Sequence, residues 1–321
     1  MGKFLDEHYY DIFKKYSKGE LMNELSSFSS GGALLTKTLE HFFKEVLFGA
    51  TQSRFKMTPM ELLNNDELVA KCIEYVNRKS NFYNPADGEI RNLEKSIHNR
   101  GTYTWKVANF RPDEARKIYK QLLPNCGTIY DYCCGWGSRM CAALCSGYNY
   151  FGTDPNTKLH KQLLECADFL NECGFMGDYD IRCTGSELLH KDWVGKVDLC
   201  FSSPPYYNLE IYCNEETQSI HNRTYGQWLK EYIVKTIFNC DNYLKSGGYF
   251  SLNIKDLPRQ GMYLYSDIER IIDRLIDSGY LKWDKQNPIE IKIGAPKNYD
   301  MDGVQTKTTS EKEYAMVYKK L

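Results

Sequence analysis

From about residue 102 onward, short runs rich in β-branched and aromatic residues alternate with stretches of helical periodicity. The expected strands lie at 126–133, 148–155, 178–186, 196–205 and 249–255, and a closing hairpin is expected at 289–293 and 313–320. The longer expected helices lie at about 156–173, 225–244 and 267–278. Such alternation predicts an open α/β sheet whose strands are mostly parallel.

The first hundred residues have a different pattern, which predicts mainly helix. In the segment 31–50, apolar residues such as Leu35, Phe43 and Leu47 recur on one helical face. The sequence 58–61 is a helix start with a Thr cap, a proline in the first turn and a Glu that closes a capping box. The segment 81–90 contains Asn-Pro and Asp-Gly and predicts a loop. We therefore expect a helical segment at 1–101 and an α/β domain at 102–321.

Composition and charge narrow the class of protein. The 321 residues include 42% hydrophobic and 26% charged side chains, as in ordinary globular proteins. No run approaches the roughly 18 apolar residues of a membrane span, and the polar N-terminus has no apolar signal core. We therefore expect a cytoplasmic protein without membrane association. The formal net charge of −1 means that nucleic-acid binding cannot be argued from bulk charge.

The chain has 12 cysteines, but they do not form the pattern of a disulfide scaffold. There is no Cys-x-x-Cys pair and no Cys/His spacing of the kind that binds zinc. Several cysteines, such as Cys72, Cys200 and Cys240, lie in apolar runs. Reduced, buried thiols and no metal site are the expectation.

The first candidate for chemistry is the expected strand-to-helix turn at 131–137, which reads Asp-Tyr-Cys-Cys-Gly-Trp-Gly. Glycines at such a turn let the backbone approach a ligand closely. Asp154 ends the next expected strand, where an acid can accept hydrogen bonds from ribose hydroxyls. The plainer interpretations are that the glycine segment is an ordinary tight turn and that Asp154 caps a helix before Pro155. Together the two features favour a bound nucleoside.

The second candidate is the sequence Ser203-Pro204-Pro205-Tyr206, which follows a buried expected strand. Two successive prolines cannot continue a central strand, and they make the exit loop rigid. A rigid loop can hold the Ser203 hydroxyl and the Pro204 carbonyl at one point, with Tyr206 as a stacking face. The plainer interpretation is a proline-stiffened surface turn.

These motifs, in this order, resemble those of the amino-group DNA methyltransferases, which use S-adenosylmethionine, and the resemblance covers about residues 107–321. It implies a Rossmann-like methyltransferase fold with a mostly parallel seven-stranded sheet and an antiparallel last strand. By this resemblance the cofactor-binding residues are Phe110, Pro112, Asp131, Cys133, Gly135, Trp136, Gly137, Asp154, Pro155 and Ser186. The catalytic residues are Ser203, Pro204, Pro205 and Tyr206.

The resemblance also implies a mechanism on double-stranded DNA. A base flips out of the duplex and stacks on Tyr206, and its exocyclic amine binds Ser203 and Pro204. The nearby Glu210 and Tyr212 are candidates for the base pocket, with a solvated loop as the alternative. Trp136 either walls the cofactor site or simply packs.

The target base follows from two cues that disagree. Family members with Ser at the first catalytic position mostly methylate cytosine N4, whereas the motif order here is more often met in adenine N6 enzymes. We favour cytosine N4, because the tetrapeptide touches the base. Methylation of RNA or of a protein glutamine amide stays open, although glutamine enzymes usually have Asn in place of Ser203. A protein that only binds nucleic acid is the alternative of another class.

No recognition domain fits between the cofactor motifs and the tetrapeptide. Reading of DNA then falls to the helical segment, to the loop 207–224 or to 294–312. Lys71, Arg78, Lys79, Arg91 and Arg100 are candidate phosphate contacts, and a solvated basic scatter is the alternative. No motif identifies a restriction partner or an oligomeric state.

Overall fold

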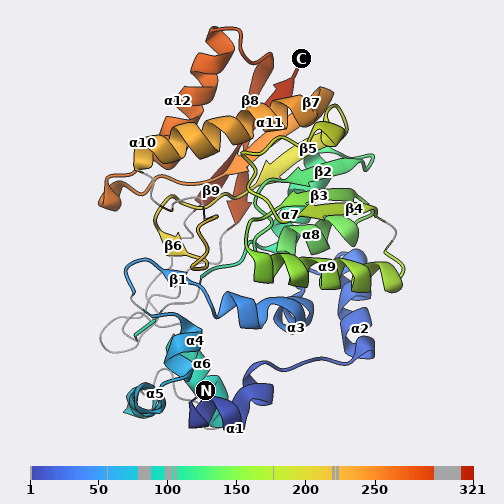
Figure 1. Cartoon of the computed structure of the whole chain (residues 1–321). Coiled ribbons are helices and arrows are strands. Elements are labelled where there is room, and N and C mark those ends of the chain that lie inside the picture. Colours follow the sequence, from blue (N-terminus) through green and yellow to red (C-terminus); the bar gives the residue numbers. More distant parts are fainter. Residues whose placement is uncertain are drawn as a thin grey trace.

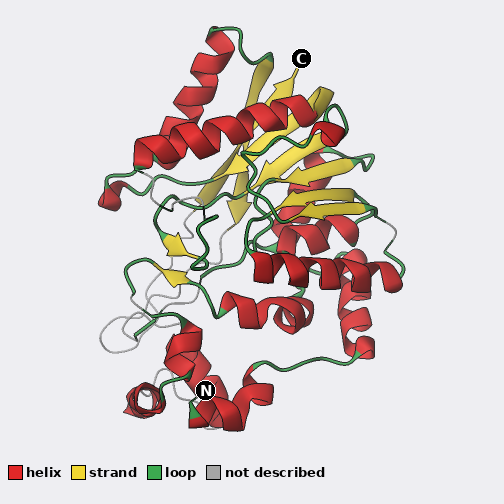
Figure 2. Ribbon diagram, in the orientation of Figure 1, coloured by secondary structure: helices red, strands yellow, loops and turns green. Residues whose placement is uncertain are grey.

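The computed structural model describes residues 2–55, 57–78, 88–97, 103–104, 107–175, 177–218, 221, 224–292 and 312–321. At its centre these residues form a seven-stranded sheet (Figures 1 and 2). In spatial order the strands are β4 (Tyr179–Arg182), β3 (Asn149–Thr153), β2 (Thr128–Asp131), β5 (Val197–Ser202), β7 (Leu244–Asn253), β9 (Lys312–Lys320) and β8 (Trp283–Lys292). Strands from β4 to β7 are parallel, and β9 is antiparallel to both of its neighbours.

The strand order reverses at β2, because β3 lies on one side of it and β5 on the other. In open α/β sheets a ligand binds at such a point, outside the carboxyl ends of the strands. The antiparallel β9 between β7 and β8 completes the Rossmann-like methyltransferase fold that the sequence predicted.

Helices cover both faces of the sheet, as the nearly continuous burial of the central strands β2 and β5 requires. On one face lie α7 (Pro112–Leu122), α8 (Ser138–Leu144) and α9 (Thr157–Glu172), and on the other α10 (Tyr225–Trp228), η3 (Leu229–Val234), α11 (Lys235–Tyr243) and α12 (Leu264–Asp277). Ile129 and Tyr130 of β2 therefore belong to two different buried clusters. Two short 3-10 turns, η2 (Lys191–Trp193) and η4 (Pro258–Gln260), lie in loops.

The N-terminal segment is helical, as expected. It contains α1 (Lys3–Ile12), α2 (Lys18–Ser29), α3 (Thr36–Leu47), the short strand β1 (Thr51–Gln52), α4 (Pro59–Leu63), α5 (Asp66–Arg78) and α6 (Gly88–Ile97). The predicted capping box of Thr58 and Glu61 begins α4. The predicted loop at 81–90 was too long, since Gly88 begins α6, and residues 81–87 lie outside the described part. None of the described helices has the length and hydropathy that a bilayer span requires.

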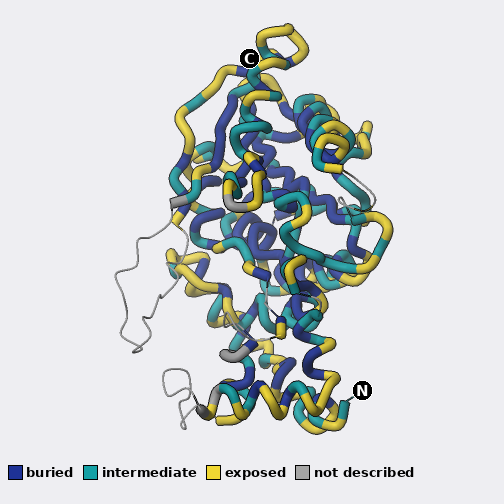
Figure 3. The backbone as a smooth tube through the Cα atoms, turned by 90° about the vertical axis from the view of Figure 1, so that its left-hand side faces the viewer, coloured by how far each residue is buried: buried dark blue, intermediate teal, exposed yellow. Residues whose placement is uncertain are grey.

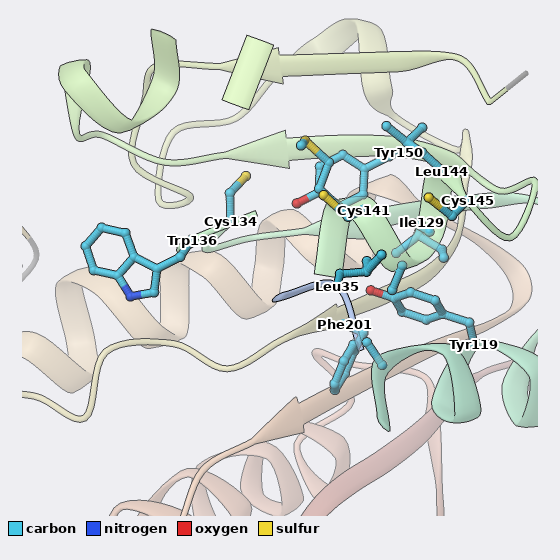
Figure 4. Close-up of a cluster of buried hydrophobic side chains, with 14 of the residues drawn as sticks. Leu35, Tyr119, Ile129, Cys134, Trp136, Cys141, Leu144, Cys145, Tyr150 and Phe201 are labelled. Carbon is cyan, nitrogen blue, oxygen red and sulfur yellow. The ribbon is translucent and has the colours of Figure 1, made fainter. Parts of the chain in front are cut away.

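The helices of this segment pack into two separate cores. Phe28, Leu35 and Phe43 lie in the buried cluster of the sheet, and Figure 4 shows Leu35 among the side chains of that cluster. Phe13 and Phe48 belong to a smaller cluster among the N-terminal helices. Figure 3 shows the buried stretches continuing from the strands into the N-terminal helices. The boundary at 101/102 stays a prediction, but α2 and α3 share the core of the α/β part.

Several elements differ from the expectation. Residues 245–248, which precede the expected strand 249–255, lie inside β7, where a register shift against β5 between Val197 and Leu199 accommodates them. β8 begins at Trp283 rather than at 289, and Pro288 is tolerated because it lies at a register shift on an edge strand. The helix predicted at 225–244 contains the π-helical η3.

Candidate active site

A cavity of about 370 Å³ lies where β2, β3, β5 and β7 end. Most of the predicted site residues line it, namely Phe110, Cys133, Gly135, Trp136, Asp154, Pro155, Ser186, Ser203, Pro204, Pro205 and Tyr206. The structure therefore brings the glycine loop, the acid after β3 and the proline-rich loop after β5 to one place. Three predicted residues do not line the cavity, namely Pro112, Asp131 and Gly137. Each of them packs against other parts of the protein.

Asp131, at the end of β2, is fully buried and faces other protein groups. Its carboxylate accepts hydrogen bonds from Arg139 Nε at 2.9 Å, from the Tyr150 hydroxyl at 2.9 Å and from the Cys133 amide at 3.3 Å. Burial opposes the charge of Arg139, but the ion pair and hydrogen bonds with Asp131 outweigh it and raise the pKa of Arg139. In this structure Asp131 holds Arg139, and Arg139 rather than Asp131 lines the cavity.

The two glycines of the loop after β2 have different roles. Both have left-handed backbone, with φ of 52° at Gly135 and 68° at Gly137. A Cβ atom at Gly135 would meet no atom closer than 3.8 Å, so its bare backbone faces the open cavity. A Cβ at Gly137 would lie 2.4 Å from Cζ of Phe43, because α3 packs against this turn. Pro112, also absent from the lining, begins α7 and is buried.

Asp154 follows β3 and lines the cavity with a largely buried carboxylate. Its two oxygens accept hydrogen bonds from the amides of Gly135 at 3.2 Å and Asn156 at 3.1 Å. Burial raises the pKa of Asp154 to about 6, although the two backbone hydrogen bonds act in the opposite direction. The cap of α9 is Asn156, whose side chain accepts from Leu159. Asp154 is thus free of the capping role that the sequence left open.

The loop after β4 brings Ser186 to the cavity. The Ser186 hydroxyl shares a 2.7 Å hydrogen bond with the hydroxyl of Thr236, and its carbonyl accepts one of 2.8 Å from Asn239. Next to this loop, Tyr232 lines the cavity from the π-helical η3. Such π turns are frequent at functional sites. Tyr232 could not be predicted from the sequence, because a π turn has no periodicity signal of its own.

The end of β5 is anchored to the glycine loop, and the tetrapeptide that follows is anchored to β7. The Ser202 hydroxyl donates to the Cys133 carbonyl at 3.2 Å, and Asn253 Nδ2 donates to Ser203 Oγ at 3.5 Å. Tyr206 lines the cavity, and burial raises the pKa of its hydroxyl well above the usual value. Tyr207 has a φ of 54°, which is uncommon for a bulky residue, and its ring packs against Trp228. The chain therefore turns sharply away after Tyr206.

The wall opposite the strand ends comes from β6 (Glu210–Ile211), which pairs with β1 of the N-terminal segment. Glu210 and Tyr212 line the cavity, as the sequence suggested, and the Tyr212 hydroxyl donates to Glu210 at 2.5 Å. Burial raises the pKa of Glu210. Trp136, whose ring centroid is 6.1 Å from that of Tyr212, also lines the cavity, and Figure 4 shows its side chain next to Cys134. The pairing of β1 and β6 brings Gln52 to this wall.

Further lining residues were not predicted from the sequence, and among them are Asn253, Lys255 and Glu313. Asn253 ends β7, Lys255 follows it, and Glu313 lies near the start of β9. A polar Asn-Ile-Lys at the carboxyl end of a buried strand was the available signal. No sequence signal indicated Glu313, because its place at the cavity depends on the pairing of β9 with β7.

The candidate phosphate contacts lie away from the cavity or outside the described residues. Lys71 forms a 2.5 Å ion pair with Glu67 one turn earlier in α5. Arg91, in α6, is exposed and has an interaction partner. Lys79, Arg100 and the side chain of Arg78 lie outside the described part.

No family model matches the sequence, and no curated protein matches it. Solved structures do match the fold. They include an S-adenosylmethionine-dependent O-methyltransferase from Thermotoga maritima, with 14% identity, a TM-score of 0.41 and coverage of 67% of this chain and 68% of that one. A similar methyltransferase from Aquifex aeolicus has 12% identity, a TM-score of 0.40 and coverage of 64% and 89%. An rRNA methylase from Streptococcus thermophilus has 12% identity, a TM-score of 0.37 and coverage of 67% and 99%. These likenesses concern the fold alone.

Proposed function

We propose that this protein is an S-adenosylmethionine-dependent DNA methyltransferase that modifies the exocyclic amine of a flipped base, with cytosine N4 as the favoured target. One observation carries the proposal: Asp154 and the tetrapeptide Ser203–Tyr206 line the same cavity. An acid suited to ribose hydroxyls and a loop suited to a planar amine then lie in one cavity. A methyl donor and its acceptor can meet there.

The cavity residues fit the cofactor. The Asp154 carboxylate lines the cavity and can accept from two ribose hydroxyls. The bare backbone of Gly135 allows close approach, and the rings of Trp136 and Tyr232 offer apolar walls. When bound, S-adenosylmethionine supplies an electrophilic methyl group on a sulfonium.

The tetrapeptide then orients the amine. The amine is a poor nucleophile because its lone pair is conjugated with the ring. Hydrogen bonds from the amine to Ser203 Oγ and the Pro204 carbonyl localise that lone pair. The rigid prolines and the Asn253 contact hold both acceptors in place. Positioning and electrostatics of this kind supply much of the rate.

The choice of DNA rests on the resemblance of the motifs, and the pairing of β1 with β6 supports a substrate role for the N-terminal segment. This pairing puts Gln52 on the cavity wall, and the segment lies next to the loop that follows the tetrapeptide. Flipping a base costs a few kcal/mol, and stacking on Tyr206 returns roughly 1–3 kcal/mol. Adenine N6 is the second candidate target, favoured by the motif order.

Methyl transfer from tritiated S-adenosylmethionine tests the substrate class. We expect label in duplex DNA and not in total RNA or in protein extract. The matched control is Ser203→Ala, which we expect to lose more than nine-tenths of turnover while keeping cofactor affinity, since Ser203 acts on the amine. Label in RNA or protein alone would overturn the DNA assignment. Cofactor binding without any transfer would favour a module that only binds.

A further inference from the structure

The first residue of the tetrapeptide is a neutral serine, so the tetrapeptide has no charged group that could accept a proton from the amine. As an amine nitrogen gains a methyl group it becomes positively charged, and it must lose one proton. A serine hydroxyl can accept a hydrogen bond, but it is a weak proton acceptor. An anionic group beside Ser203 would meet this requirement.

Glu313 of β9 is such a group. Its carboxylate lines the cavity and pairs with Lys255 Nζ at 2.8 Å. Asn253 Nδ2 lies 3.4 Å from Glu313 Oε2 and 3.5 Å from Ser203 Oγ, so a single amide group contacts both side chains. The carboxylate is therefore connected to the tetrapeptide through Asn253.

Two other acids that line the cavity are less suitable. Asp154 is the acid that we assign to the ribose hydroxyls of the cofactor, and no hydrogen bond connects it to the tetrapeptide among the described residues. Glu210 accepts from the Tyr212 hydroxyl, and burial raises the pKa of Glu210 and so favours its neutral form. Glu313 is held instead by a lysine, which stabilises a negative charge.

Asn253, which bridges Ser203 and Glu313, is itself almost completely enclosed. The residue lines the cavity and is 2% exposed. Its Oδ1 is buried and accepts no hydrogen bond from the residues that the structure describes. Packing around this amide therefore keeps the bridge between Ser203 and Glu313 in place.

We propose that Glu313 is the anionic acceptor for the target amine, an inference that rests on the proposed function and deepens it. The nitrogen lone pair forms the bond to the methyl carbon, the C–S bond breaks and its electron pair stays on sulfur. The nitrogen releases one proton to a Glu313 oxygen, from which it passes to solvent. Asn253 aligns Glu313 with Ser203, so the acceptor from β9 supplies the negative charge that the tetrapeptide lacks.

The test compares Glu313→Gln with Glu269→Gln. Glu269 also pairs with a lysine, Lys285, at 3.0 Å, but it does not line the cavity. Single-turnover methylation is measured on an unmethylated DNA duplex that contains the site methylated by the wild-type protein. Calorimetry gives the cofactor affinity. Fluorescence anisotropy, without the cofactor, compares that duplex with one that has an abasic site at the target position.

In Glu313→Gln we expect at least a tenfold slower single turnover, cofactor affinity within twofold of wild type, and at least a fivefold shift in binding preference towards the abasic duplex. Glu269→Gln should match wild type in all three. A turnover in Glu313→Gln within twofold of wild type would overturn the role of Glu313 alone. A loss of cofactor affinity as large as the loss of turnover would also overturn the role of Glu313, since the residue would then act on the methyl donor. A wild-type protein that methylates no nucleic acid would overturn the proposed function as well.

Discussion

At the scale of single residues, the acids at the ends of β2 and β3 show what the sequence could and could not predict. Both Asp131 and Asp154 match the motif, and the sequence assigned both to the cofactor. The structure separates them, since Arg139 and Tyr150 occupy the carboxylate of Asp131 whereas Asp154 lines the cavity. Arg139 lies in a helix beside an apolar run, where a charged residue signals a buried partner. The sequence did not identify which acid is that partner.

Asp154 leads to a prediction on pH. Its pKa is raised from 3.8 to about 6 by burial, so its contribution to stability is present below pH 3.8 and is lost as the pH rises through about 6. The carboxylate that accepts ribose hydroxyls therefore predominates only above about pH 6. We expect the affinity of wild type for S-adenosylmethionine, measured by calorimetry, to fall up to about tenfold per pH unit below that value.

The variant Asp154→Asn should bind the cofactor at least tenfold more weakly at pH 8, since hydrogen bonds to a charged group contribute about 1.5–3 kcal/mol each. Its remaining affinity should change little with pH between 5 and 8. Asp178→Asn, which changes an exposed acid before β4, is the control and should behave as wild type. Equal cofactor affinity in Asp154→Asn and wild type would contradict the ribose assignment.

At the scale of elements, the catalytic loops depend on segments that are distant in the sequence. The strand and helix pattern predicted the order of β2, α8, β3, α9 and β5, because each unit is local. It did not predict that α3 packs on the glycine turn, nor that β1 pairs with β6. Pairing between segments more than 150 residues apart has no local signature in a single sequence.

The packing of α3 on the glycine turn leads to a second prediction. Gly137→Ala should reduce the free energy of unfolding by about 2–4 kcal/mol, because it adds both a left-handed backbone penalty and a contact with Phe43. Gly147→Ala is the matched control, since its φ is 80° but its Cβ would meet only Cys126 Sγ at 4.0 Å. We expect about 1–2 kcal/mol there.

Urea denaturation measures both variants. In a double-mutant cycle, Phe43→Ala should relieve part of the cost of Gly137→Ala and none of the cost of Gly147→Ala. Equal costs for the two glycine substitutions would contradict the proposed contact between α3 and the turn.

At the scale of the whole molecule, one part of the N-terminal segment packs into the core of the sheet and another part packs into a core of its own. Phe28 lies in the sheet's core, where the guanidinium of Arg116 from α7 stacks 4.2 Å from its ring centroid. Phe13 lies in the separate N-terminal cluster. The sequence predicted a change of secondary structure near residue 101, but packing does not follow that boundary, because helical periodicity shows that a face is apolar and not what it packs against.

This sharing of the core can be tested with two phenylalanines. Phe28→Ala should reduce the unfolding free energy of the sheet by about 3–5 kcal/mol, and Phe13→Ala should have a smaller effect. Tryptophan fluorescence in urea reports on the sheet, since Trp136, Trp193, Trp228 and Trp283 belong to its clusters. If neither variant shifted the transition, the N-terminal segment would be an independent unit.

We propose that one cavity brings a methyl donor and the amine of a base together. Mass spectrometry of nucleosides tests it most directly, with duplex DNA incubated with the protein and S-adenosylmethionine that carries a deuterated methyl group. We predict labelled N4-methylcytosine, and none with Ser203→Ala. Labelled N6-methyladenine alone would correct the base and leave the mechanism standing. The absence of any labelled nucleoside, from a protein that binds the cofactor, would contradict the account.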